Sequence, residues 1–329
     1  MLILGDSTTW GNGLADTPNK NKFHKFGSLV AQWIADAQKV RVDLVVLAHS
    51  AATLEDNGQD DGRRFPGSAN YRYPVVVKQA QCLNEQDRNQ VKLVLLDGCI
   101  NDVGAFEIVN PSRNEAWVRN STTEHCGDPV RTMLTQVATL YPNALIVITG
   151  YFPIISEKSD IADLLNFFRQ FFPQDRTSMR LQTYRARAVP SEAIQARSTS
   201  AGNAKLFYDL SNQLISDAVA AANAALSSKR IVFVEVRFGP NNAFGAPKAW
   251  LWPIPTVFSG FDEEYFERQA PCLQAYFGEF AGFETCRIDS TGHPNITGAS
   301  AYACSIERVL TQTWQLPDGA TPTDCPVPE

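Results

Sequence analysis

Five short apolar runs, separated by segments of helical character, constrain the fold of this chain more than any other feature. The two runs nearest the middle of the chain are continuously apolar and rich in valine, isoleucine and leucine, which is typical of parallel strands covered on both faces. The runs are Leu2–Leu4, Leu44–Leu47, Leu93–Leu96, Leu145–Thr149 and Ile231–Val236. The helices expected between and after them are Phe26–Gln38, Tyr73–Leu83, Asp128–Leu140, Asp160–Phe171, Ala204–Leu226 and Ile296–Trp314. This alternation predicts an α/β protein in which helices cover both faces of a five-stranded parallel sheet, with right-handed crossovers.

The length of 329 residues fits one large α/β domain or two small ones, with enough chain to bury a sizeable core. Two segments exceed the usual length of a connection: residues 151–202 after the fourth strand, and residues 238–288 after the fifth. Both are rich in aromatic residues, and long insertions at strand ends usually form lids or pocket walls. We therefore expect one domain, residues 1–329, in which these insertions shape a site.

Charge and hydropathy narrow the range of partners. A formal net charge of −6 provides no broad cationic surface, so neither nucleic acid nor an anionic membrane is expected as the main partner. No apolar run approaches the roughly 18–20 residues of a membrane span. The sequence gives no indication of oligomeric state.

The seven cysteines point to an oxidising compartment. Cys99 falls in a strand-end motif and is expected to be a buried thiol, whereas the other six fall near loops or helix ends, where disulfide partners are common. Six cysteines allow fifteen pairings, among which Cys272 with Cys286 and Cys304 with Cys325 are the local options. Because the chain starts abruptly on its first strand, a removed leader and a secreted protein are the interpretation favoured here. A cytosolic protein with reduced cysteines is the alternative.

Three polar motifs follow strands or precede the last helix. Gly5-Asp6-Ser7 ends the first strand, Gly98-Cys99-Ile100-Asn101-Asp102 ends the third, and Asp289-Ser290-Thr291-Gly292-His293-Pro294-Asn295 precedes the last helix. Open α/β sheets build their sites at the carboxyl ends of the strands. Serine, asparagine and histidine at this edge indicate hydrolytic chemistry.

A serine hydroxyl needs a neighbouring base to become a nucleophile. The chain has four histidines, His24, His49, His125 and His293. His49 ends the second strand and competes on position alone, while His24 and His125 are expected in a polar segment and a loop. His293 is favoured because the upstream carboxylate of Asp289 can orient its imidazole, which gives the parts of a serine–histidine–acid triad.

Together these motifs resemble those of the SGNH hydrolases, also called GDSL-type esterases and lipases. The resemblance spans the whole chain, with the motifs in family order. It implies a flavodoxin-like sheet, Ser7 as nucleophile and His293 as general base and then acid. It also implies an oxyanion hole made of the Ser7 backbone N–H, the Asn101 amide and a backbone N–H after the second strand.

Two positions depart from the family pattern. Ala51 stands where the family usually has a glycine after the second strand, and it can supply the same backbone N–H unless φ must be positive. The family acid normally lies three residues before the histidine, where this chain has Ser290. Asp289 lies four residues before, so an extra loop residue could bring it to the ring, or Ser290 and a main-chain carbonyl could orient the ring instead.

The sequence thus predicts a serine ester hydrolase of the esterase or lipase type, which works through an acyl-serine intermediate and needs no metal or organic cofactor. Short acyl esters, lysophospholipids and acetylated sugars are all possible substrates. Two alternatives stay open: a binding module that keeps the fold without catalysis, and an acyltransferase that uses the same residues. The chain has no G-x-S-x-G elbow, dinucleotide fingerprint or C-x-x-C pair, so other hydrolase, nucleotide-binding and zinc classes lack support.

Overall fold

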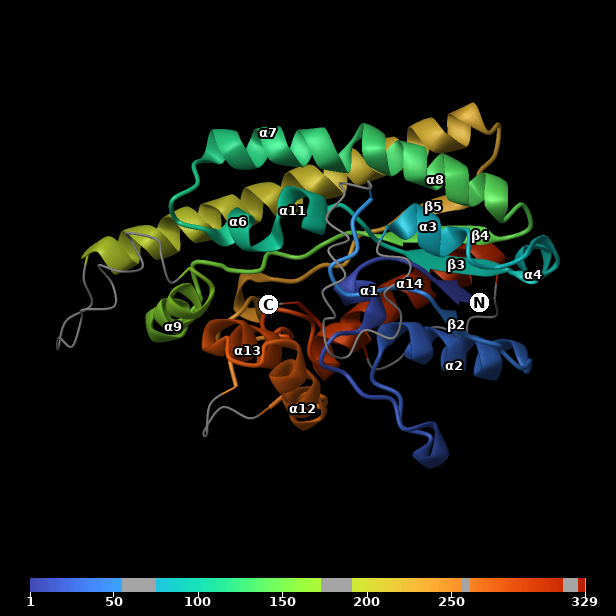
Figure 1. Ribbon diagram of the computed structural model, residues 1–329. Helices are drawn as coiled ribbons and strands as arrows, with labels where there is room; N and C mark the ends of the chain where they lie inside the picture. The colour runs from blue at the N-terminus through green and yellow to red at the C-terminus, as the bar shows by residue number, and fades with distance from the viewer. Residues whose placement is uncertain (55–74, 173–190, 256–260, 316–324, 329) are drawn as a thin grey trace.

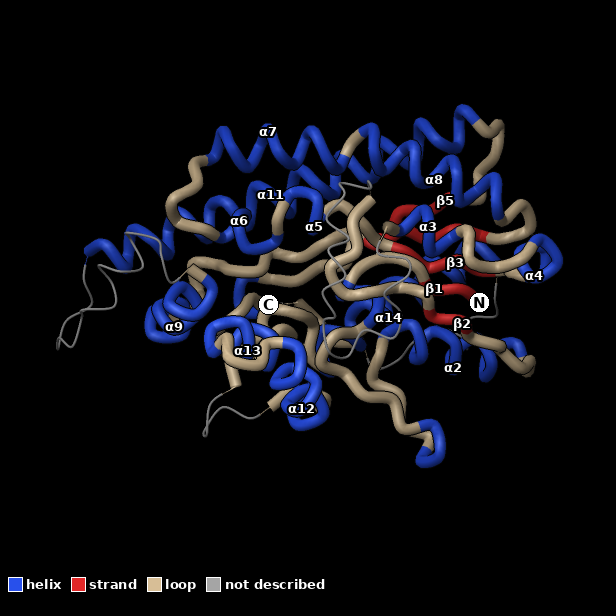
Figure 2. The backbone as a smooth tube through the Cα atoms, in the orientation of Figure 1, coloured by secondary structure: helices blue, strands red, loops and turns tan. Residues whose placement is uncertain are grey.

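A single parallel sheet organises the chain. The computed structural model describes residues 1–54, 75–172, 191–255, 261–315 and 325–328. Five strands in this part of the chain form one sheet in the order β2-β1-β3-β4-β5, which is the flavodoxin-like order (Figure 2). The strands are β1 (Leu2–Ile3), β2 (Val45–Val46), β3 (Leu93–Leu96), β4 (Leu145–Thr149) and β5 (Ile231–Val234). The predicted α/β fold class is confirmed.

The middle of the sheet is the core of the molecule. Every residue of β3 and β4 is buried, and these strands pair in register from Leu93 with Leu145 to Leu96 with Ile148. At the edge of the sheet, Val45 and Val46 of β2 are 38% and 42% exposed. Continuous apolar runs therefore mark the strands covered by helices on both faces.

Helices form a layer on each side of the sheet (Figure 1). One layer contains α7 (Glu115–Cys126), α8 (Asp128–Leu140) and α11 (Ser191–Ala225). The opposite layer contains α2 (Phe26–Gln38) and α14 (Ile296–Trp314). The ring of Phe26 on α2 stacks on Tyr302 of α14 at 5.0 Å between centroids, and the Tyr302 hydroxyl donates to the Gly150 carbonyl just beyond β4. This contact joins the second layer to the sheet.

The remaining helices are short and lie largely at the ends of the strands. They are α1 (Ser7–Trp10), α3 (Val76–Ala80), α4 (Glu85–Gln90), α5 (Ile100–Val103), α6 (Ala105–Val109), α9 (Ile161–Phe171), α12 (Tyr265–Ala275) and α13 (Phe280–Arg287), with 3₁₀ turns at Pro18–Lys20 and Pro240–Asn242. The helices α6, α9, α12 and α13 surround the region where the site is found. The last three lie in the two predicted insertions.

Three expected helices, α2, α8 and α14, have the predicted bounds, whereas one expected helix starts earlier and one expected loop is helical. The helix expected to begin at Ala204 begins at Ser191, because its first turns bury small and polar side chains such as Ala196 and Ser200. The loop expected around His125 is the last turn of α7, whose buried face contains Thr122 and Cys126. The new first turns of α11 bury no large apolar residue, and the last two turns of α7 bury none beyond Val118, so helical periodicity is weak in both.

The disulfides differ in part from the expectation. Cys272–Cys286 and Cys304–Cys325 form as predicted, and a third bond joins Cys99 to Cys126. The prediction of a buried Cys99 thiol was therefore wrong, and Cys82, expected to be a disulfide partner, takes part in none of the three bonds. The bond of Cys99 to α7 depends on how distant segments pack, which spacing along the chain does not reveal. Among the described helices, none combines the length and the apolar character needed to cross a membrane.

Candidate active site

The three polar motifs meet at the carboxyl edge of the sheet. Ser7 is the first residue of α1, directly after β1, and its side chain is nearly buried, at 8% exposure. Asp6 caps this helix by accepting a hydrogen bond from the Thr8 backbone N–H at 2.8 Å. Gly5 has φ +122°, and a Cβ there would lie 2.0 Å from Oδ1 of Asp97. The Gly-Asp-Ser order therefore lets the chain turn sharply beneath the serine.

The hydroxyl of Ser7 is in direct contact with His293. Its Oγ lies 2.7 Å from Nε2 of the ring, and Nδ1 lies 3.1 Å from the carbonyl oxygen of Ser290. A carbonyl oxygen can only accept, so Nδ1 carries the proton and Nε2 faces the serine with its lone pair. The ring is thus held as the tautomer that can accept a proton from Ser7.

Backbone pairing fixes the loop that carries the histidine. The Trp252 backbone N–H donates to the His293 carbonyl at 2.8 Å, and the Gly292 N–H donates to the Trp252 carbonyl at 3.0 Å. Asn295 then caps α14 by accepting from the Gly298 N–H. Burial lowers the pKa of His293 below its ordinary value, although the charge of Asp6 and the Ser290 carbonyl act in the opposite direction. The imidazole is therefore neutral at neutral pH.

Asp289, the sequence candidate for the triad acid, faces away from this hydrogen bond. Its Oδ1 lies 3.0 Å from Nε of Arg268, a buried side chain that also pairs with Asp262. Asp262 in turn accepts from the Ser290 hydroxyl at 2.6 Å. Burial raises the pKa of Asp289 to about 7 even though Arg268 opposes the shift. Within the described chain, the hydrogen-bond partner of His293 Nδ1 is the Ser290 carbonyl.

Ala51 and Asn101 line the same pocket as Ser7 and His293. Ala51 adopts φ +62°, the left-handed conformation that favours glycine, so this position has the positive φ at which alanine is strained. The Asn101 amide donates to the Ala52 carbonyl at 2.9 Å, and the Leu54 N–H lies 3.0 Å from both carboxylate oxygens of Asp102. These bonds tie the loop after β2 to α5.

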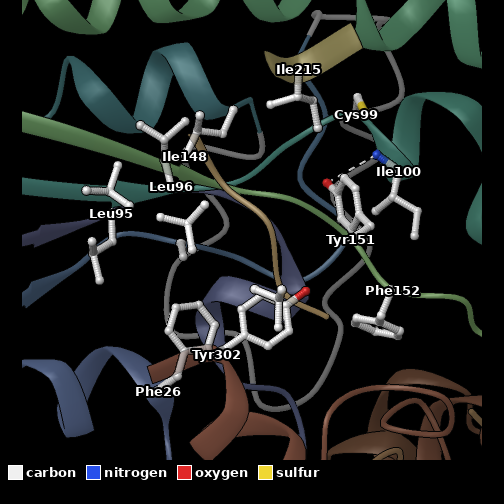
Figure 3. Packing of buried hydrophobic residues seen from close by; sticks show 14 of the residues in the cluster. Phe26, Leu95, Leu96, Cys99, Ile100, Ile148, Tyr151, Phe152, Ile215 and Tyr302 are labelled. Carbon is white, nitrogen blue, oxygen red and sulfur yellow. Dashed lines mark hydrogen bonds between the residues drawn. The ribbon is translucent and has the colours of Figure 1, made fainter. Parts of the chain in front are cut away.

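A buried cluster of polar side chains next to Ser7 was not predicted from the sequence. The Tyr151 hydroxyl donates to Oδ2 of Asp6 at 2.9 Å. It also accepts from the Ile100 N–H at 3.3 Å, the bond drawn in Figure 3. Oδ1 of Asp97 accepts from the Asp6 N–H at 2.8 Å. Burial, together with the neighbouring Asp6, raises the pKa of Asp97 well above its ordinary value. Asp97 directly follows β3 and Tyr151 lies two residues after β4, so the carboxyl-edge rule could have indicated both.

An apolar pocket opens beside Ser7 and encloses about 220 Å³. Its wall combines α5, α6 and α9 with the α12–α13 segment. In the wall, Phe171 stacks on Phe106 at 4.6 Å and approaches Phe167 at 4.7 Å. The lining residues are Ser7, Thr8, Ser50, Ala51, Ile100, Asn101, Ala105, Phe106, Val109, Phe152, Ile154, Phe167, Phe171, Tyr276, Thr285, Cys286, Asp289, Thr291, Gly292 and His293.

The other histidines lie elsewhere. The ring of His24 pairs with Glu263 at 2.5 Å, and His125 lies at the end of α7. His49 is buried after β2, where its backbone N–H donates to the Gly5 carbonyl. In the described ranges, histidine, cysteine, aspartate and glutamate side chains form no group of three or more that could hold a metal ion.

No protein-family model and no curated protein matches this sequence. The structure is similar to an extracellular lipase from Streptomyces rimosus, with 14% identity, a TM-score of 0.50, and 93% of this chain and 97% of that chain covered. It is also similar to phospholipase A1 from Streptomyces albidoflavus, at 15% identity, TM-score 0.47 and 94% and 97% coverage. A family two carbohydrate esterase from Clostridium thermocellum matches at 11% identity, TM-score 0.43 and 96% and 64% coverage. At such identities the likeness concerns the fold, which matches the flavodoxin-like sheet expected from the SGNH resemblance.

Proposed function

We propose that the chain is a serine ester hydrolase that works through an acyl-serine intermediate. The observation that carries the proposal is the 2.7 Å contact between the Ser7 hydroxyl and His293 Nε2 at an apolar pocket. A hydroxyl within hydrogen-bond reach of an oriented, neutral imidazole is the arrangement that nucleophilic catalysis requires. The SGNH-type motif order and the matching fold support the same assignment.

In the first half-reaction, Ser7 Oγ attacks the ester carbonyl while His293 Nε2 takes the hydroxyl proton. The Ser290 carbonyl holds the ring through Nδ1–H, and its partial negative charge stabilises the imidazolium that forms. The protonated ring then donates its proton to the departing alkoxide, which leaves as the alcohol. We thus assign the orienting role to the Ser290 carbonyl and not to the Asp289 carboxylate.

The tetrahedral intermediate carries a negative oxygen that needs fixed donors. We assign these donors to the backbone N–H groups of Ser7 and Ala51 and to the amide of Asn101, because all three residues line the pocket. The Asn101 amide nitrogen carries two hydrogens, so its bond to the Ala52 carbonyl leaves the other for the oxyanion. The bonds between the Ala52–Leu54 loop and α5 keep these donors in place.

In the second half-reaction, His293 takes a proton from water as the water attacks the acyl-Ser7 carbonyl. Collapse of this second intermediate returns the proton to Ser7 and releases the acid. Each step uses only this chain's own groups and water.

The pocket favours an acyl group of moderate length. A cavity of about 150 Å³ holds benzene, so by proportion the 220 Å³ here holds a chain of roughly nine carbons. Its walls are mainly aliphatic and aromatic, which suits an acyl chain better than a sugar ring. We therefore favour lipid esters over acetylated carbohydrates. The three disulfides support an extracellular setting.

A series of p-nitrophenyl esters with two to sixteen carbons tests this function. We expect hydrolysis with an optimum at medium chain length, and a fall in kcat of about 10³-fold or more for Ser7→Ala. Asn101→Ala is expected to lower kcat by about 10²–10³-fold through loss of one oxyanion donor. Asp289→Asn serves as the discriminating variant, because the proposal predicts a loss of less than about tenfold. Absence of ester hydrolysis by the folded protein would overturn the function, and an Asp289→Asn loss equal to that of Ser7→Ala would restore the carboxylate as triad acid.

A further inference from the structure

The α12–α13 segment exposes large apolar side chains that the proposed reaction does not use. On α12, Phe266 is 71% exposed and Leu273 is 53% exposed. In the turn and at the start of α13, Phe277 is 85% exposed and Phe280 is 77% exposed. We call these four side chains the α12–α13 apolar surface. Single exposed apolar residues are common on protein surfaces, whereas several large ones in one segment usually mark an interaction site.

This surface is held rigidly by its own fold. The disulfide between the buried Cys272 and Cys286 joins the two helices. Gly278 turns the chain at φ +86°, and the Glu279 N–H closes the turn on the Tyr276 carbonyl at 2.8 Å. The disulfide and the hydrogen-bonded turn therefore hold Phe277 and Phe280 in their exposed positions.

The same segment borders the proposed site. Tyr276, Thr285 and Cys286 line the pocket beside Ser7, and Phe277 follows Tyr276 directly in the chain. A Cβ at Gly282 would lie 2.3 Å from the Tyr276 ring, so the ring rests against the α13 backbone. Figure 1 shows α13 near α9, and residues of both helices line the pocket. The α12–α13 apolar surface is thus continuous along the chain with residues that line the pocket.

Charge decides which apolar partner this surface fits. Residues 261–288 contain six acidic and two basic side chains. Both arginines pair within the segment: Arg268 is buried with Asp262, and Arg287 pairs with Glu284. Outside the segment, Glu263 pairs with His24 and Glu264 with Lys25. The acidic side chains exposed next to the apolar ones are therefore Glu267 and Glu279. A surface with this charge is repelled by anionic phosphates and suits a partner without net charge.

We propose that the α12–α13 apolar surface docks on lipid aggregates that carry no net charge. The phenylalanines insert among the outer methylene groups, and the pocket mouth then faces the layer from which an ester is drawn. That the pocket takes its ester from this lipid layer rests on the proposed ester hydrolase activity. Docking on the layer does not depend on that activity. A phosphatidylcholine vesicle is the simplest form of such a surface.

Flotation with phosphatidylcholine vesicles tests docking separately from catalysis. The full chain carrying Ser7→Ala is used so that the lipid is not consumed. We expect it to bind, and we expect Phe277→Ser/Phe280→Ser in the same background to lower the partition coefficient by about tenfold or more. The matched control is Val40→Ser, which alters a 47% exposed side chain after α2, outside this surface, and should leave binding unchanged. Added phosphatidylglycerol should weaken binding.

Several results would overturn the proposal. They are failure of the Ser7→Ala chain to bind neutral vesicles, equal binding by the double serine variant, or binding that requires phosphatidylglycerol. A vesicle-free dimer that the double variant converts to a monomer, without vesicle binding, would assign the surface to a second copy of the chain. Hydrolysis of soluble p-nitrophenyl acetate, unchanged in Phe277→Ser/Phe280→Ser, reports the proposed function separately. If the chain with Ser7 intact does not hydrolyse p-nitrophenyl acetate, the proposed function is contradicted and the docking result still stands.

Discussion

The Tyr151 hydroxyl is expected to be one of the most important single polar groups for stability. It is fully buried and joins two segments at the serine: it donates to the Asp6 carboxylate and accepts from the Ile100 N–H. Tyr151→Phe keeps the ring and removes only the oxygen. Loss of a hydrogen bond to a carboxylate costs about 1.5–3 kcal/mol, and a buried N–H left unpaired costs about 1–3 kcal/mol. We expect the free energy of unfolding to fall by about 3 kcal/mol.

Urea unfolding followed by tryptophan fluorescence measures this loss. Tyr208→Phe is the matched control, because the Tyr208 hydroxyl donates to the exposed Glu235 carboxylate at 3.0 Å, where water can replace it. The control is expected to lose less than about 1 kcal/mol. If the two variants lose the same amount, the buried cluster does not stabilise the serine turn as argued here.

Three further predictions concern the same site. Because burial lowers the pKa of His293 and catalysis needs the neutral ring, kcat/KM should be lost as pH falls, with a midpoint below about 6.5; a midpoint near 7 that disappears in Asp289→Asn would assign the titration to Asp289 instead. Ala51→Gly should raise the free energy of unfolding by about 1 kcal/mol with ester hydrolysis retained, since φ is +62°; a measurable loss of stability in urea would contradict this. Gly5→Ala should lower the free energy of unfolding by about 3 kcal/mol or more, because the added Cβ clashes with Asp97. In the control Gly202→Ala the added Cβ meets nothing within 4 Å, so this change should stabilise α11. Similar melting temperatures for the two variants would contradict this prediction.

The fold can be predicted from the sequence because strands that are buried on both faces have continuous apolar sequences. The continuous apolar runs of β3 and β4 identify the covered centre of the sheet, and the rule that sites gather at the carboxyl ends of strands places Ser7, Asn101 and His293 at one edge. All three line one pocket in the structure. Motif positions and strand order therefore carry most of the information about where the site lies.

What the sequence could not predict depends on side-chain direction. Four residues of separation between Asp289 and His293 do not reveal that the carboxylate turns toward Arg268 while the Ser290 carbonyl reaches the ring. Arg268 belongs to an insertion without a motif, so nothing in the sequence announced it. The same limit applies to Cys99, whose partner lies at the end of α7, because spacing along the chain does not show which distant segments pack together.

The central claim is that His293 activates Ser7, and labelling with a fluorophosphonate probe tests it most directly. We expect a stoichiometric adduct located on Ser7 by peptide mass, labelling at least about 10²-fold slower in His293→Ala, and near-normal labelling in Asp289→Asn. A folded protein that forms no adduct, or one that labels Ser7 equally fast without the imidazole, would contradict the claim.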